Sequence, residues 1–65
     1  MINVQSESGV IINELMLFNT VGELLYINQP NESRVAINVN SLPKGIYFLN
    51  IKSADQTITK KVIIQ

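Results

Sequence analysis

The sequence predicts an all-β fold, a small antiparallel β-sandwich of about six strands. Its apolar residues recur with a period of two, which is typical of strands, and no segment carries the apolar stripe of an amphipathic helix. Short apolar segments follow one another at spacings of roughly 8 to 12 residues, with polar or glycine-containing turns between them. A small barrel of similar strand count gives the same pattern and remains the alternative architecture.

Length and composition limit the chain to one small domain, residues 1–65. A chain of this size buries only about 60% of its unfolded surface. Hydrophobic residues make up 46% of it and charged residues 15%, which is too apolar for a disordered tail. Because it contains no cysteine and no histidine, neither a disulfide nor a zinc site is expected to reinforce the core.

The first two strands lie before residue 19. Ile2 and Val4 alternate with polar residues and predict a short strand. A longer strand is expected from about Ile11 to Phe18, and its uninterrupted apolar run, in which Leu15 and Leu17 oppose Met16 and Phe18, indicates burial on both faces.

A hairpin is predicted around Asn19–Gly22. Asparagine tolerates a positive φ and glycine adopts it readily, so this segment favours a tight turn. The apolar segment Leu24–Ile27 follows directly and is expected to pair with the strand before the turn.

Three further strands are expected after the polar turn cluster Gln29–Ser33. Val35, Ile37 and Val39 share one face of a half-buried strand. The segment Leu42–Gly45 then turns the chain into the next strand.

That next strand, Ile46–Ile51, is expected to be central. Its alternate residues Tyr47, Leu49 and Ile51 should lie on the better buried face, with Ile46 and Phe48 forming a second apolar row. A turn at 54–56 then leads into a last strand over 57–64.

The residue inventory argues against an enzyme. Acid–base and nucleophilic catalysis usually use histidine or a close pair of carboxylates, and the chain has no histidine. The acidic residues fall mainly in or beside predicted turns, where solvated surface positions are expected: Glu7, Glu14, Glu23, Glu32 and Asp55. We therefore predict no catalytic residue, no cofactor, no metal site and no small-molecule substrate.

Charge indicates no polyanionic partner. Five basic and five acidic residues cancel, so neither nucleic acid nor an anionic membrane is favoured. The basic residues are scattered except for the pair Lys60 and Lys61. Because neighbouring strand residues point to opposite faces, one lysine must lie beside the inward row. The pair either protects a sheet edge from other strands or takes part in recognition.

Three blocks of the chain form a recognisable series. They are Leu15–Leu25 (LMLFNTVGELL), Leu42–Ile51 (LPKGIYFLNI) and Ile58–Gln65 (ITKKVIIQ). In order, spacing and position they resemble the type A C-terminal sorting domain of type IX secretion (Por secretion) cargo from Bacteroidetes, and the block with the Leu-Pro-Lys-Gly-Ile-Tyr core is the strongest match.

The resemblance implies an immunoglobulin-like sandwich that follows a cargo domain. It implies a protein that reaches the periplasm through a separate N-terminal signal, in transit to the outer membrane surface or the extracellular space. The outer-membrane translocon of the type IX system would recognise the domain. A sortase-like surface peptidase would then remove it and exchange it for a lipopolysaccharide anchor.

The resemblance also assigns roles to single residues. Gly22, Leu42, Pro43, Gly45 and Tyr47 match structural motif positions. Glycines there allow tight turns, the proline fixes φ, and the tyrosine offers a ring to the core and a hydroxyl to a backbone partner. Translocon recognition is expected in the last strand, at Lys60, Lys61, Val62, Ile63, Ile64 and Gln65.

One departure from the family concerns the N-terminus. Family members begin with a first strand upstream of the position of Ile2, and residues 1–65 lack it. We therefore expect an N-terminally truncated fragment with an open sheet edge and self-association through that edge. The alternative to a sorting signal is a non-catalytic adhesive or spacer module of a surface protein.

Overall fold

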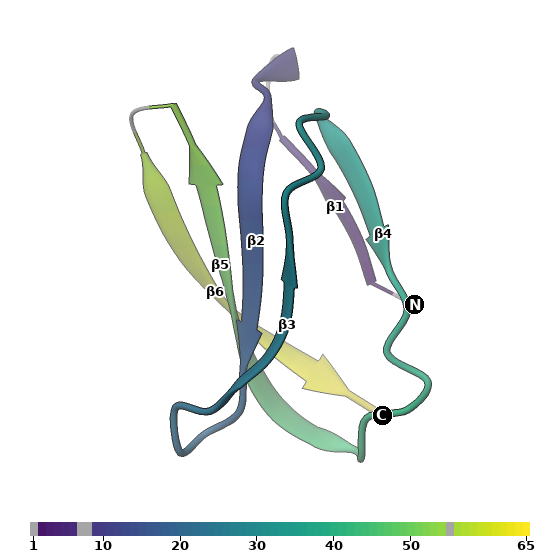
Figure 1. Ribbon diagram of the computed structural model, residues 1–65. Coiled ribbons are helices and arrows are strands. Elements are labelled where there is room, and N and C mark those ends of the chain that lie inside the picture. Colours follow the sequence, from purple (N-terminus) through teal and green to yellow (C-terminus); the bar gives the residue numbers. More distant parts are fainter. Residues whose placement is uncertain (1, 7–8, 55) are drawn as a thin grey trace.

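The six expected strands are present in the computed structural model, which describes residues 2–6, 9–54 and 56–65 (Figure 1). Their bounds differ from the expected ones by one or two residues. They are β1 (Ile2–Gln5), β2 (Ile12–Phe18), β3 (Leu24–Asn28), β4 (Arg34–Ile37), β5 (Gly45–Ser53) and β6 (Thr57–Ile64).

The strands form two separate antiparallel sheets. One has four strands in the order β3-β2-β5-β6, and the other pairs β1 with β4. Figure 1 shows the β1–β4 pair standing beside the larger sheet as a second layer. Within the described residues this arrangement is a small sandwich and not a closed barrel. β5 is central, as expected, because it pairs with β2 on one side and β6 on the other.

The core lies between the two sheets. Both layers contribute to it, and the side chains that are almost fully buried are aliphatic or aromatic. They are Val4, Ile12, Leu15, Leu17, Ile37, Val39, Tyr47 and Leu49. The expected alternation is therefore confirmed in β4, where Val35 is half-buried and Ile37 buried, and in β5, where Tyr47 and Leu49 face the core.

A β-bulge in β2 brings two apolar residues that are out of alternation to the same face of the sheet. Ile12 and Leu15 are both buried although they are three positions apart, and a regular strand would point them to opposite faces. The pairing with β5 shifts between Ile12 and Glu14, which inserts one extra residue. The bulge thus returns Ile12 to the core face.

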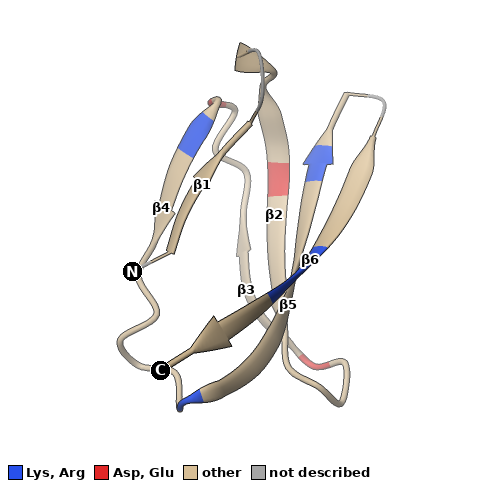
Figure 2. Ribbon diagram, turned by 180° about the vertical axis from the view of Figure 1, so that it is seen from behind, with Lys and Arg blue, Asp and Glu red and all other residues tan. Residues whose placement is uncertain are grey.

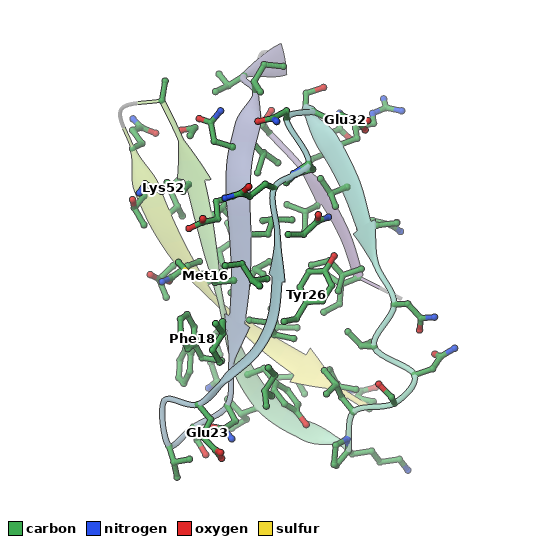
Figure 3. All side chains as sticks on the ribbon, viewed as in Figure 1. Met16, Phe18, Glu23, Tyr26, Glu32 and Lys52 are labelled. Carbon is green, nitrogen blue, oxygen red and sulfur yellow. The ribbon has the colours of Figure 1, made fainter. Side chains whose placement is uncertain are left out.

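The expectation that both faces of β2 are buried is wrong for one of them. Leu15 and Leu17 are buried, whereas Met16 and Phe18 are only half-buried. The second layer covers one face of the four-stranded sheet, and within the described residues nothing covers the other. We call that uncovered side the outer face, and Figure 3 shows Met16 and Phe18 along it.

The predicted hairpin turn is confirmed. The Asn19 carbonyl accepts a hydrogen bond from the Gly22 amide at 3.1 Å, and Gly22 has a φ of +87°. The Asn19 side-chain oxygen accepts two further bonds, from the amides of Val21 at 3.1 Å and Glu23 at 2.9 Å. Asparagine and glycine therefore both have the roles that the sequence indicates.

Two expectations concern residues outside the described ranges. The turn at 54–56 contains Asp55, and the surface position of Glu7 is likewise outside them. The Ser53 amide donates a hydrogen bond to the Gln56 carbonyl oxygen at 2.9 Å, and this bond joins β5 to the residue that precedes β6.

Candidate functional site

The last strand, β6, lies at an edge of the four-stranded sheet. It pairs with β5 along its whole length, from Lys52 opposite Thr57 to Gly45 opposite Ile64. Its other edge has no neighbouring strand among the described residues. The backbone groups on that edge are therefore open to another strand.

Lys60 and Lys61 lie midway along β6, where Figure 2 shows a blue band. Lys60 stands opposite Leu49 on the core face, as the alternation predicted, and Lys61 stands opposite Phe48 on the outer face. Both lysines are exposed. The strand thus presents one positive charge to each side of the sheet at the same height.

The end of β6 combines anchoring and exposed side chains. Val62 and Ile64 pack against the core, whereas Ile63 is 61% exposed on the outer face. Gln65 is exposed as well. The alternation holds the strand in place through one row and leaves the other row free for contact.

A hollow of about 400 Å³ brings the end of β6 together with the loop before β5. From the last strand it is lined by Ile63, Ile64 and Gln65, and from the loop by Leu42 and other residues. Two blocks that are separate in sequence therefore border the same surface.

Tyr47 connects the loop to the core. Its side chain is 6% exposed, and its hydroxyl donates a hydrogen bond to the carbonyl oxygen of Pro43 at 2.5 Å. The expected pairing of a buried ring with a backbone partner is confirmed. The bond holds the chain four residues upstream against the start of β5, close to Val62, which pairs with Tyr47.

The other motif positions shape the same loop. Gly45 begins β5 with a φ of +156°, a value that residues with a side chain rarely adopt. Leu42 packs partly against the core, and its amide donates to the Val39 carbonyl at 3.0 Å. These residues position the loop and carry no reactive group.

Few of the described side chains could bind a metal or take part in catalysis. Among residues 2–6, 9–54 and 56–65 no three acidic, histidine or cysteine side chains come together as a metal site would require. Glu14 is half-buried in β2, where its carboxylate accepts a hydrogen bond from the side-chain Nε2 of Gln29 at 3.3 Å, and Glu23 and Glu32 are exposed. In the same ranges no helix has the length and apolar character needed to cross a membrane.

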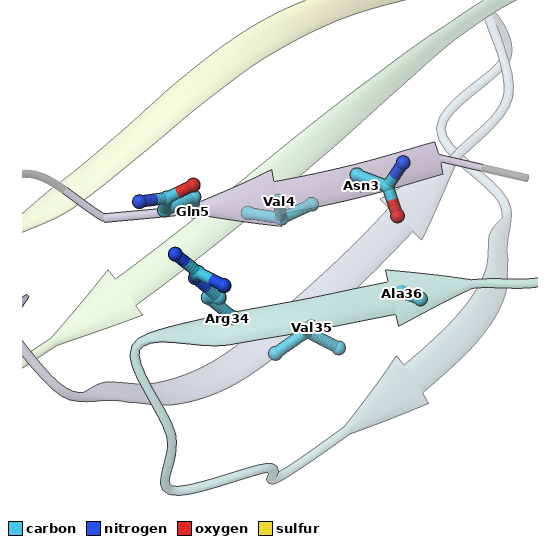
Figure 4. A pocket seen from close by; sticks show the side chains of 6 residues that line it. All are labelled: Asn3, Val4, Gln5, Arg34, Val35 and Ala36. Atoms are coloured by element: carbon cyan, nitrogen blue, oxygen red, sulfur yellow. The ribbon is translucent and has the colours of Figure 1, made fainter.

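Two further hollows were not predicted from the sequence. One, of about 420 Å³, lies along β1 and β4, and Figure 4 shows Gln5 beside Arg34 across the two strands. The other, of about 210 Å³, lies between β1 and the core face of β5 and β6, with Ile58 and Lys60 among its lining. The pairing of β1 with β4 forms the first and the packing of the two sheets forms the second, so alternation alone could not reveal either.

Comparison with known proteins identifies a family for this chain. The model of the secretion system C-terminal sorting domain family matches residues 1–65, the whole chain. No curated protein and no solved structure matches significantly. Sorting domains of this family are secretion signals and not a class of enzymes, and each is attached to a cargo protein bound for the outer membrane or cell surface. The chain therefore belongs to the secretion system C-terminal sorting domain family, as a sorting signal of type IX secretion.

Proposed function

We propose that β6 is the part of this sorting domain that the type IX translocon reads, through Lys60, Lys61, Val62, Ile63, Ile64 and Gln65. The observation that carries the proposal is the placement of β6. It is an edge strand with two exposed lysines and an exposed C-terminal residue, and no described strand pairs with its outer side. A receptor can contact it without unfolding the domain.

The later steps of the proposal concern processing at the surface. After transport, a sortase-like peptidase removes the domain and the cargo is joined to a lipopolysaccharide anchor. The domain supplies no catalytic group to this exchange, because its role is that of a substrate: the peptide bond between cargo and domain is broken as the bond between cargo and anchor forms. The absence of histidine from the chain agrees with a passive role.

Export of a reporter tests the recognition step. The chain is fused to the C-terminus of a periplasmic reporter in a host with a type IX system, and surface reporter is measured. Removing Lys60 to Gln65 is expected to abolish export. Because Val62 and Ile64 also pack on the core, this deletion alone does not separate recognition from folding.

A second variant keeps the core row intact. Changing Lys61→Ser and Ile63→Ser alters only exposed side chains of β6, and we expect it to reduce export strongly. The matched control changes Leu24→Ser and Ile27→Ser, two exposed residues of the opposite edge strand, and is expected to preserve export. Equal export of the β6 variant and the intact fusion would contradict the recognition role of β6.

A further inference from the structure

We propose that the partner of β6 is an extended segment that adds to its open edge as a further strand and carries two adjacent carboxylates opposite Lys60 and Lys61. This inference rests on the proposed recognition role of β6 and names the chemistry of its partner.

The first step concerns the backbone. One side of β6 is paired with β5 through eight residue pairs, and the other side has no strand among the described residues. An edge strand of this length offers a row of unpaired amide and carbonyl groups, to which an extended peptide can add by main-chain hydrogen bonds. The open edge of β6 therefore favours a partner that adds an extended strand over a partner that presents a compact folded surface.

The second step concerns charge. In the four-stranded sheet Lys60 has Leu49 opposite it, and Lys61 has Phe48. Their neighbours two positions away along β6 are also uncharged: Ile58, Thr59, Val62 and Ile63. Neither lysine is thus balanced by its neighbours in the sheet. Opposite charges directly across a strand pair are favourable, whereas like charges are unfavourable.

The same charges disfavour a second copy of this chain at the edge. In an antiparallel pair of two β6 strands centred on the lysines, a lysine of one copy would stand opposite the same lysine of the other, since directly opposed residues share a face of the sheet. Lysine on an edge strand discourages such pairing. A partner segment with two adjacent carboxylates satisfies both lysines, because neighbouring strand residues point to opposite faces as Lys60 and Lys61 do.

The flanking residues of β6 define the rest of the partner. Thr57 and Thr59 favour polar or β-branched residues opposite them on the outer face. Ile63, on the same face, is 61% exposed and favours an apolar residue. The partner is therefore polar at one end, acidic in the middle and apolar at the other.

A peptide titration tests the inference on the full 65-residue chain. The probe is a synthetic peptide of threonine and valine residues with two central glutamates and an apolar end, and binding is followed by isothermal titration calorimetry. We expect it to bind at least about tenfold more tightly than the same peptide with two lysines, since two cross-strand charge pairs change sign. Equal binding of the two peptides would overturn the charge argument.

Two variants of the experiment separate strand addition from simple attraction. An acidic peptide with alternate N-methylated amides keeps the charges but loses main-chain donors, and its binding is expected to disappear. In the protein, K60E/K61E should lose the acidic peptide and bind the lysine peptide. The proposal would be overturned if the methylated peptide still bound, or if K60E/K61E did not reverse the preference between the acidic and the lysine peptide.

Anionic lipid is the competing partner for a lysine pair. Vesicles of phosphatidylglycerol are therefore mixed with the chain, and lysine-dependent binding to them without binding to the acidic peptide would overturn the strand proposal.

The export assay distinguishes this inference from the proposed recognition role of β6. If K60E/K61E loses the peptide but is exported normally, the acidic partner is wrong. If the Lys61→Ser, Ile63→Ser fusion is exported normally, the recognition role of β6 is wrong.

Discussion

Tyr47 shows how one side chain links the loop before β5 to the core. The ring fills space between the sheets, and the hydroxyl satisfies the Pro43 carbonyl. A buried hydroxyl needs a partner, because an unsatisfied polar group inside a protein is costly. The loop conformation and the packing of the central strand therefore depend on each other.

Replacing this hydroxyl tests the link. Tyr47→Phe keeps the ring but removes the donor, and the free energy of unfolding is expected to fall by about 1 kcal/mol in urea denaturation. Tyr26→Phe is the control, since no hydrogen bond of the Tyr26 hydroxyl is found within the described part of the chain. A loss of equal size in both variants would contradict the importance of the Pro43 contact.

Gly22 has the backbone conformation that the hairpin turn requires. Its φ of +87° places it where residues with a Cβ are unfavourable, although no atom lies within 4 Å of where the Cβ would be. Gly22→Ala is therefore expected to cost about 1 to 2 kcal/mol through backbone strain alone. Thr20→Ala, in the same exposed turn, should change stability by less than about 0.5 kcal/mol. Thermal unfolding of both variants decides whether the strain is real.

The two edge strands of the larger sheet differ in their protection. β6 carries Lys60 and Lys61, whereas β3 has no charged residue and exposes Leu24, Leu25 and Ile27. An uncharged apolar edge is a template for pairing with other chains. The unprotected edge of this sheet is therefore β3.

Substitutions on the two strands should act in opposite directions. Ile27→Lys places a charge on β3 and is expected to lower the average mass of the isolated chain in multi-angle light scattering. Lys60→Thr with Lys61→Thr removes the protection of β6 and is expected to raise it. If neither the Ile27→Lys variant nor the double lysine variant changes the measured mass, edge charge does not govern association.

The molecule as a whole leaves much apolar surface uncovered. Among the described residues only two strands face the core side of the four-stranded sheet, and the outer face exposes Ile46, Phe48 and Ile63. Ile58, which lines the hollow between β1 and the core face of β5 and β6, is partly exposed as well. A net charge of zero provides no general repulsion between copies.

Self-association of the isolated chain is the expected consequence. Light scattering at several concentrations should show a mass that rises with concentration. A concentration-independent monomer would contradict the expectation that open strand edges and uncovered apolar surface drive association.

Alternation and turn chemistry were enough to predict much of this fold. The central strand, its Tyr47 and Leu49 row and the Gly22 hairpin follow from local rules that act over a few residues. A backbone partner for the Tyr47 hydroxyl was expected as well, and the structure identifies it as the carbonyl of Pro43, only four residues away. Such features need no knowledge of distant segments.

Only the tertiary structure decided which faces are covered. The apolar run Leu15–Phe18 looks buried on both sides in sequence, but the second layer has two strands and covers one face. The bulge that turns Ile12 inward and the open side of β6 also depend on pairing between segments far apart in the chain. Local pattern determines which residues share a face, whereas the packing of distant strands determines whether that face meets the core, solvent or a partner.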